Sequence, residues 1–460
     1  MSNFVILSSS FRDPSGFLFS HDGVLYRQVN MVYKEDYDCL IHSGLYDALV
    51  KDELLVSHEN VTIDSPQSDS VYKVIKPNRV EFIAYPYEWC FSQLKAAALA
   101  TLNVQKKALD FDMSLKDCSA YNIQFFENHP LLIDTLSFEK YIVNRPWVAY
   151  RQFCQHFLAP LALMSHRDIR LGQLLRTNID GIPLDLASKL LPLRTRFRLS
   201  LLSHIHLHAK SQGYFASRPT KMNDRTLSRR ALIALVDNLA STVEKLDWSS
   251  KGTEWVDYYE ETNYSSEAIA HKRQIIDNFV NIVQPRNVWD LGANIGTFSR
   301  IASDKGIATI AFDVDPGAVE KNYLDCVKNR EKNILPLLVD LTNISPSIGW
   351  HNQERLSLIE RGPTDMVFAL ALIHHLAISN NLPFGKIAKF LSNISKSLAI
   401  EFIPKDDSQV MKLLVTRKDI FQEYTQENFE RSFRKYFTIR EVVQIKDSKR
   451  IMYLMEKSAI

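Results

Sequence analysis

The sequence has few cysteines, no long apolar runs and almost no excess of charge. Its 460 residues include five cysteines, none of them in a CxxC pair, which argues against a disulfide framework or a zinc ribbon. The longest apolar stretches, such as MVFALALI, are too short to cross a bilayer. Lysine and arginine number 55 against 53 acids, so the overall charge favours neither a nucleic-acid nor an anionic-membrane partner, although it leaves room for a local basic patch.

The N-terminus lacks the basic start and apolar run of a signal peptide. Together with the scattered cysteines, this predicts a reduced, cytoplasmic protein. A chain of this length exceeds one ordinary core, so we expect two domains. The polar, proline-containing segment SRPTKMNDRTLSRR, residues 217–230, is the best linker. We therefore expect an N-terminal α+β domain over 1–245 and a second domain over 246–460.

The first half mixes strand and helix patterns. Two apolar runs around Asp22 and Gly23 predict a β-hairpin over 16–29. Apolar residues at helical spacing predict a helix over 92–110, with Ser92 as its N-terminal cap. A further long helix is expected over 185–212. The second half instead alternates short apolar runs with helical segments, which predicts a doubly wound, Rossmann-like α/β domain with a parallel sheet.

The stretch VWDLGANIGTFSR, residues 288–300, combines a buried strand with a glycine-containing loop. A dinucleotide fingerprint requires glycines at positions one, three and six. If Gly292 is position one, position three is Asn294 and position six is Thr297. Two of the three required glycines are therefore missing, and the dinucleotide fingerprint is excluded. The pattern formed by Asp290, Gly292 and Gly296 instead predicts a tight turn beside a ligand smaller than a dinucleotide.

This loop resembles motif I of the class I S-adenosylmethionine-dependent methyltransferases. The resemblance implies S-adenosyl-L-methionine as cofactor, with the donor site shaped by Asp290, Gly292, Asn294 and Gly296. Downstream acids agree with it. Asp313 follows Asp290 by 23 residues, close to the interval of roughly 20 for an acid that binds ribose hydroxyls. The family also places a side chain near the adenine, and Asp340 has that position here.

Three residues are the candidates for acceptor chemistry, because they follow the fourth and fifth apolar runs: His374, His375 and Glu401. Ligands of open α/β sheets lie at the carboxyl ends of strands. A histidine there could take a proton from an attacking hydroxyl or amine. The alternative is that the two histidines cap and pack under the next helix, and which residue is the general base stays open.

A second constellation lies in the first half, where Asp117, Asn122 and Asp134 have the spacing of a kinase-like catalytic loop and metal-binding acid. The histidine before the first acid, the Phe-Gly after the second and a glycine-rich phosphate loop are missing. The fold is therefore read as a degenerate kinase-like domain that recognises an acceptor or partner protein. Two alternatives stay open, a bifunctional kinase and methyltransferase, and a non-catalytic scaffold.

Longer segments resemble the NoeA-type nodulation-protein family over nearly the whole chain: YPYEWCFSQLK, DTLSFE, RPWVAYRQFCQHFLAPLALM and ALALIHHLAISNN. That resemblance implies modification of a glycan or secreted-factor precursor. It assigns no acceptor-binding residue. The remaining histidine cluster, HIHLHAK, places only His204 and His208 on one helical face, and without a third ligand no metal site is expected.

Overall fold

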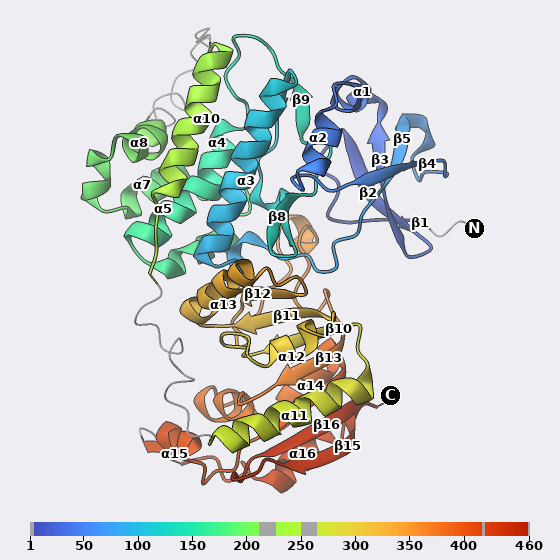
Figure 1. The fold of residues 1–460 in the computed structure, drawn as a ribbon, viewed down its shortest axis with the longest axis vertical. Helices are drawn as coiled ribbons and strands as arrows, with labels where there is room; N and C mark the ends of the chain where they lie inside the picture. Colours follow the sequence, from blue (N-terminus) through green and yellow to red (C-terminus); the bar gives the residue numbers. More distant parts are fainter. Residues whose placement is uncertain (1–3, 211–226, 250–264, 416–418, 459–460) are drawn as a thin grey trace. The chain divides into compact units, whose positions relative to one another are not determined.

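The computed structural model describes residues 4–210, 227–249, 265–415 and 419–458, and the chain divides into two compact units (Figure 1). The first comprises Met1–Trp248 and Ile348–Arg355, and the second comprises Ser249–Ser347 and Leu356–Ile460. The short segment Ile348–Arg355 lies in the sequence of the second domain but packs in the first unit. Most of the expected linker, residues 217–230, falls outside the described residues.

A five-stranded antiparallel sheet, in the order β1-β2-β3-β5-β4, forms one part of the first unit. Its strands are β1 Phe4–Ile6, β2 Gly16–His21, β3 Val24–Asn30, β4 His58–Val61 and β5 Val71–Pro77. The predicted hairpin is confirmed as β2 and β3, and its turn places Asp22 and Gly23 at positive φ. Two helices, α1 Lys34–His42 and α2 Leu45–Lys51, connect β3 to β4.

The rest of the first unit is mainly helical. Its helices are α3 Phe91–Asp110, α4 Tyr150–Phe153, α5 Ala159–His166, α6 Leu174–Thr177, α7 Leu184–Leu190, α8 Leu199–Leu201 and α10 Arg229–Glu244. Four short strands, β6 Met113–Leu115, β7 Ile123–Phe126, β8 His129–Leu132 and β9 Phe138–Lys140, form the pairs β6-β9 and β7-β8. The helix predicted over 92–110 is present, but the cap at Ser92 is wrong. Cys90 takes the N-cap position, and Gln93 accepts a hydrogen bond from its N–H.

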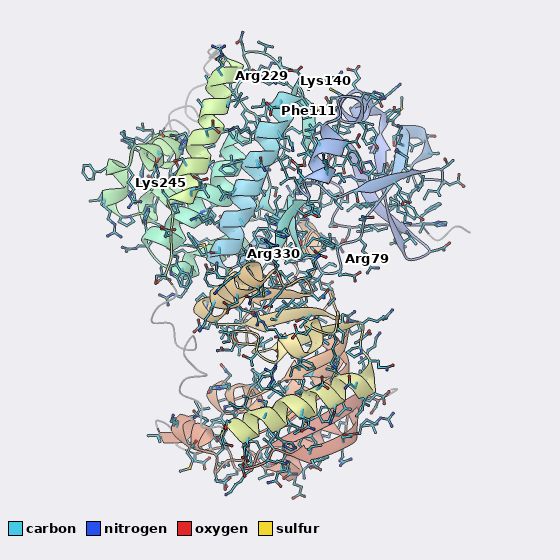
Figure 2. The ribbon with its side chains drawn as sticks, viewed as in Figure 1. Arg79, Phe111, Lys140, Arg229, Lys245 and Arg330 are labelled. Carbon is cyan, nitrogen blue, oxygen red and sulfur yellow. The ribbon has the colours of Figure 1, made fainter. Side chains whose placement is uncertain are left out.

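Helices α3 and α10 pack as an antiparallel pair (Figure 2). Charged contacts follow the pair from one end to the other. Lys95 donates to the carbonyl of Glu244, and Arg229 pairs with Asp112 just after α3. Because these contacts are exposed, each contributes little to stability.

The long helix predicted over 185–212 is wrong, because Pro192 interrupts it. Helix α7 ends at Leu190, a 3₁₀ turn spans Leu193–Phe197, and helical structure resumes at Leu199. Proline lacks the N–H that an uninterrupted helix needs and restricts the residue before it to extended backbone. Leu191 accordingly has φ −67° and ψ 141°.

The second unit is a Rossmann-like α/β domain with a seven-stranded sheet in the order β12-β11-β10-β13-β14-β16-β15. The strands are β10 Asn287–Leu291, β11 Ala308–Asp313, β12 Ile334–Leu338, β13 Thr364–Ala369, β14 Ser395–Phe402, β15 Phe437–Gln444 and β16 Ile451–Lys457. The first five are parallel, and the last two form the antiparallel hairpin. This confirms the predicted doubly wound fold.

Helices cover both faces of this sheet. They are α11 Ser266–Val283, α12 Ser299–Ser303, α13 Pro316–Asn329, α14 Phe384–Ile394, α15 Ser408–Val415 and α16 Gln426–Phe433. Strand alternation separates the faces. Ala399 packs in the same core as Phe279 of α11, whereas Phe402 points to the other face and contacts Phe384 and Phe429. Among the described residues, no helix is both long and apolar enough to cross a membrane.

Candidate functional site

The loop after β10 has the backbone that its glycines predict. Gly292, Asn294 and Gly296 all have positive φ, at 75°, 51° and 78°. At Gly296 a Cβ atom would lie 2.7 Å from the side chain of Asn322, so only glycine fits. The amides of Gly292 and Ala293 both donate to the carbonyl of Phe312 at 2.9 Å. The loop is therefore fixed against the end of β11.

Asp290 stabilises this loop from inside the domain. It is buried, and Ser299 at the start of α12 donates its hydroxyl to Asp290 Oδ2 at 2.7 Å. Burial raises the pKa of Asp290 to about 7, and the Ser299 hydrogen bond opposes that shift. Asp290 thus connects the end of β10 to α12 and helps to fix the loop between them.

Asp313 connects the ends of β10 and β11. Its Oδ2 accepts the backbone N–H of Asn294 at 2.7 Å, and its Oδ1 accepts that of Asp315 at 2.8 Å. Burial raises the pKa of Asp313 to about 6, against these backbone hydrogen bonds. A carboxylate has about four acceptor positions, so Asp313 keeps acceptor capacity while it orders the loop.

Asp340 follows the third strand, β12, and is exposed. Its Oδ1 accepts hydrogen bonds from the N–H of Thr342 at 2.8 Å and from the Thr342 hydroxyl at 2.7 Å. Val339 donates its N–H to the carbonyl of Asp313, so the two strand ends are adjacent. Asp340 therefore lies at the sheet edge that carries Asp313, and its role at the adenine end stays a prediction.

The two histidines lie after β13, at the same edge of the sheet. Their ring centroids are 4.1 Å apart, and His375 opens a π-helical turn, His375–Ser379. His374 is 2% exposed, and its Nδ1 has no hydrogen-bond partner among the described residues. Burial lowers the pKa of His375 to about 4 and lowers that of His374 well below its usual range. Both imidazoles are therefore neutral at physiological pH.

Glu401 at the end of β14 is fully buried, and its carboxylate already holds structural partners. Its Oε2 accepts hydrogen bonds from Lys272 Nζ at 2.7 Å and from the N–H of Ala371 at 2.8 Å. Ala371 has a left-handed backbone, with φ 49°, which is costly for a residue with a Cβ. The contacts give Glu401 the role of fixing the loop that leads to His374.

Sequence reasoning missed the cations beside Glu401. Lys272 of α11 is buried, and desolvation lowers its pKa although Glu401 opposes the shift. Arg450 lies 3.6 Å from Glu401 and holds Asp407 through two hydrogen bonds, of 2.8 and 3.0 Å. The one signal for Lys272 was its place on the apolar face of α11, between Ala268 and Ile276. Arg450 gave no such signal.

In the first unit, the three residues of the kinase-like pattern lie together. Ser137 donates to Asp134 Oδ2 at 2.5 Å and accepts from Asn122 Nδ2 at 3.3 Å. Burial raises the pKa of Asp117, with Asp134 as a further contributor. Arg27 of β3 forms an ion pair with Asp134 at 2.5 Å. The cluster therefore brings two acids and an amide together, and an arginine already pairs with the second acid.

No metal site was expected at the histidines of the HIHLH segment. In the structure, His204 and His206 form hydrogen bonds with side chains of the first unit. His204 bonds Tyr150 and Asn238, both at 2.7 Å. His206 bonds Ser188 and Thr195. Within the described residues, no group of three or more His, Cys, Asp or Glu side chains is placed to hold a metal ion.

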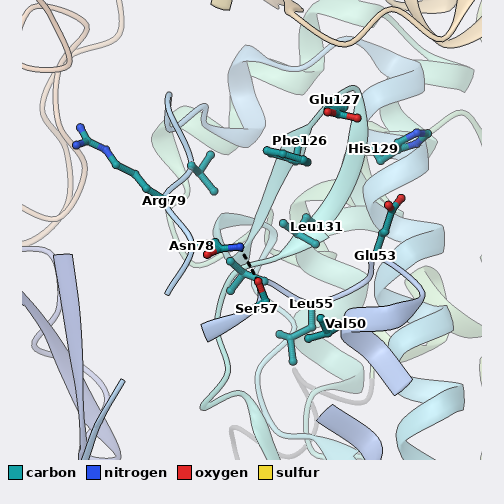
Figure 3. A pocket seen from close by; sticks show the side chains of 12 residues that line it. Val50, Glu53, Leu55, Ser57, Asn78, Arg79, Phe126, Glu127, His129 and Leu131 are labelled. Atoms are coloured by element: carbon teal, nitrogen blue, oxygen red, sulfur yellow. Dashed lines mark hydrogen bonds between the residues drawn. The ribbon is translucent and has the colours of Figure 1, made fainter. Parts of the chain in front are cut away.

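A hollow of about 160 Å³ lies in the first unit, between the chain after α2, the chain after β5 and the β7–β8 turn (Figure 3). Leu55 and Leu131 form part of its apolar lining, and Glu53 and Arg79 bring opposite charges to it. None of the residues predicted as site residues lines it. The hollow is therefore separate from both clusters described above.

Comparison with known proteins gives one relative over nearly the whole chain. No family model matches. The nodulation protein NoeA of Rhizobium meliloti (strain 1021) is 35% identical over 461 residues, which cover 98% of this chain and 96% of that protein. Identity at this level over both full lengths shows common family membership.

Solved structures match over less than half of the chain. The magnesium protoporphyrin IX methyltransferase of Synechocystis PCC 6803, with bound SAH, is 14% identical over 44% of this chain and 93% of its own, with a TM-score of 0.32. The methyltransferase domain of bacterial CtHen1-C is 15% identical over 42% of this chain and 100% of its own, with a TM-score of 0.31. The second unit has a Rossmann-like α/β fold, and the chain belongs to the NoeA nodulation-protein family.

Proposed function

We propose that the second unit transfers the methyl group of S-adenosylmethionine to a nucleophilic atom of a small-molecule or glycan acceptor. The observation that carries this proposal is the joint between Asp313 and the donor loop, where the Asp313 carboxylate accepts the N–H of Asn294. The Asp313 carboxylate, which has hydrogen-bond acceptor positions left over, thus lies beside a tight loop of positive φ at the carboxyl edge of a parallel sheet. Ligands of open α/β sheets bind at this edge.

The residues present suit the cofactor. Asp313 would bind the ribose hydroxyls, Asp340 would face the adenine end, and the loop from Gly292 to Gly296 would border the methionine end. S-adenosylmethionine, when bound, supplies a methyl group on a positively charged sulfur. The protein's contribution is to hold donor and acceptor in line and to exclude water, which can account for much of the rate.

For the acceptor, we propose that His374 or His375 takes the proton that a hydroxyl or amine loses as it is methylated. Both imidazoles are neutral at physiological pH, so each has one ring nitrogen of the kind that accepts a proton. Their low pKa values make them weak bases, so positioning must contribute more than proton transfer. Glu401 accepts the N–H of Ala371 and so helps to position the loop that carries both histidines.

The first unit is proposed to recognise the acceptor or a partner protein that carries it. A second candidate function is phosphoryl transfer, which the convergence of Asp117, Asn122 and Asp134 favours. The ion pair between Arg27 and Asp134 opposes it, because magnesium would have to displace that guanidinium.

Calorimetric titration of the full chain with S-adenosylmethionine, its demethylated product, and ATP with magnesium separates these functions. We expect the first two ligands to bind. If ATP with magnesium also binds, and Asp134→Asn abolishes that heat while leaving donor binding intact, the first unit is a second nucleotide site. Failure of all three ligands to bind would overturn the methyltransferase proposal in favour of a scaffold.

A further inference from the structure

One surface segment of the first unit alternates large apolar side chains with arginines. The apolar members are strongly exposed: Leu193 at 70%, Phe197 at 87% and Leu199 at 82%. The three arginines between them are exposed as well: Arg194, Arg196 and Arg198. An isolated exposed leucine requires no explanation, but a contiguous group of this kind marks an interaction surface. These side chains belong to one segment, Leu193–Leu199.

The backbone of this segment is fixed from below by a buried threonine. Thr195 is fully buried, and its hydroxyl donates to the carbonyl of Pro192 at 2.6 Å. Its Oγ1 also lies 3.0 Å from Nε2 of His206, whose Nδ1 lies 2.8 Å from the Ser188 hydroxyl. Because the threonine proton goes to Pro192, the imidazole Nε2–H must donate to Oγ1. His206 thus fixes Thr195 on the buried side of the segment, while the residues on either side of Thr195 are exposed.

The sequence on both sides of the segment is rich in positive charge. No Asp or Glu occurs in the sequence between Asp185 and Asp224. That interval carries seven cations: Lys189, Arg194, Arg196, Arg198, Lys210, Arg218 and Lys221. Arg194 and Arg198 contact the carbonyl and the ring of His166, and burial lowers the pKa of that histidine. No ion pair joins the three arginines of the segment to a described carboxylate, so their charge is available to a partner.

A partner for this segment must offer an apolar phase and negative charge together. A nucleic-acid backbone offers the charge alone. The interface of an anionic bilayer offers both, because leucine and phenylalanine enter the acyl boundary while arginine reaches the headgroups. Helices α7 and α8, which flank the segment in sequence, lie on the side of the first unit away from its five-stranded sheet (Figure 1). We propose that Leu193–Leu199 attaches the first unit to the surface of membranes that contain anionic lipid.

Co-sedimentation of the full chain with vesicles tests this attachment. We expect binding to phosphatidylcholine vesicles that contain phosphatidylglycerol, and little binding to phosphatidylcholine alone. Added salt should weaken the binding, because exposed charges are screened. Replacement of Arg196 by Gln should lower the partition coefficient by about fivefold, since one basic residue near an anionic surface contributes about a factor of this size. Phe197→Ser should lower it further.

Matched controls are available on the same unit. Val143 is 69% exposed and Arg145 is exposed, and both lie far from the segment in sequence. Val143→Ser and Arg145→Gln should leave vesicle binding unchanged. Equal binding by all variants would overturn the proposal. It would also be overturned if Phe197→Ser lowered the melting temperature of the free protein, because another part of the chain then covers the segment. A concentration-dependent dimer lost in Phe197→Ser, without vesicle binding, would assign the surface to a second copy instead.

Discussion

The carboxylate of Glu401 lies 2.7 Å from the ammonium nitrogen of Lys272, and both side chains are buried. The pair links α11, which precedes the sheet, to the end of its fifth strand, across 129 residues of sequence. The same carboxylate holds the N–H of Ala371. An ion pair inside the domain thus sets the backbone from which His374 and His375 extend.

Removal of one member of this pair should destabilise the protein strongly. A buried charge without its partner costs about 3–5 kcal/mol, so Lys272→Met and Glu401→Gln are each expected to lower the free energy of unfolding by an amount of that order. The double variant Lys272→Met/Glu401→Gln should lose less than the sum of the two. Denaturant unfolding measures all three. Additive losses would mean that the two groups do not interact.

Loss of the Asp313 carboxylate should weaken donor binding strongly in a protein that remains folded. Hydrogen bonds to a charged acceptor contribute about 1.5–3 kcal/mol each, and two ribose hydroxyls are involved. Asp313→Ala should therefore weaken S-adenosylmethionine binding by at least about 100-fold. The matched control is Asp365→Ala. Asp365 begins β13 at the opposite end of the strands and pairs with Arg286 and Lys396. Unchanged affinity in Asp313→Ala would exclude the ribose role.

The stability contributed by Asp290 should depend on pH in a definite direction. Its pKa is raised from an ordinary value near 3.8 to about 7, so the folded protein holds a proton that the unfolded chain releases. The resulting stability is present below pH 4 and is lost as the pH rises through about 7. Asp290→Asn keeps an acceptor for Ser299 but does not titrate. Relative to the wild type, this variant should therefore gain stability, on the order of a few kcal/mol, between pH 4 and pH 8.

Denaturant unfolding at several pH values measures that difference. A difference between Asp290→Asn and the wild type that stays constant with pH would mean that the Asp290 carboxyl is ionised in the folded protein.

The sheet and the donor loop could be predicted because their signals are local. Buried parallel strands read as continuous apolar runs, and each run here ends near a polar residue that the structure places at one edge, such as Asp313 or His374. The positive-φ turn at Gly292 and Gly296 also follows from residue type alone. The order of elements along the chain then fixed the topology.

The rest depends on contacts that sequence spacing does not contain. Glu401 was predicted for acceptor chemistry from its place after a strand. Its partner Lys272 lies on a helix that precedes the sheet, and Arg450 lies in the terminal hairpin. Ala371 adopts a left-handed backbone that its residue type disfavours. The break at Pro192 was a local signal, and the helix predicted across it ignored the restriction that proline imposes.

The last prediction concerns His374, which is buried with Nδ1 unpaired. A buried polar group without a partner costs about 1–3 kcal/mol, so His374→Leu should unfold at a higher denaturant concentration than the wild type. If the imidazole accepts the acceptor's proton, the same variant should lose about 10²- to 10⁴-fold in methyl transfer. Transfer of radiolabelled methyl from S-adenosylmethionine into an extract of the source cells measures the activity, and calorimetry confirms that the donor still binds. A more stable variant with undiminished transfer would reduce His374 to a packing residue. It would leave His375, whose pKa near 4 also keeps it neutral, as the remaining base.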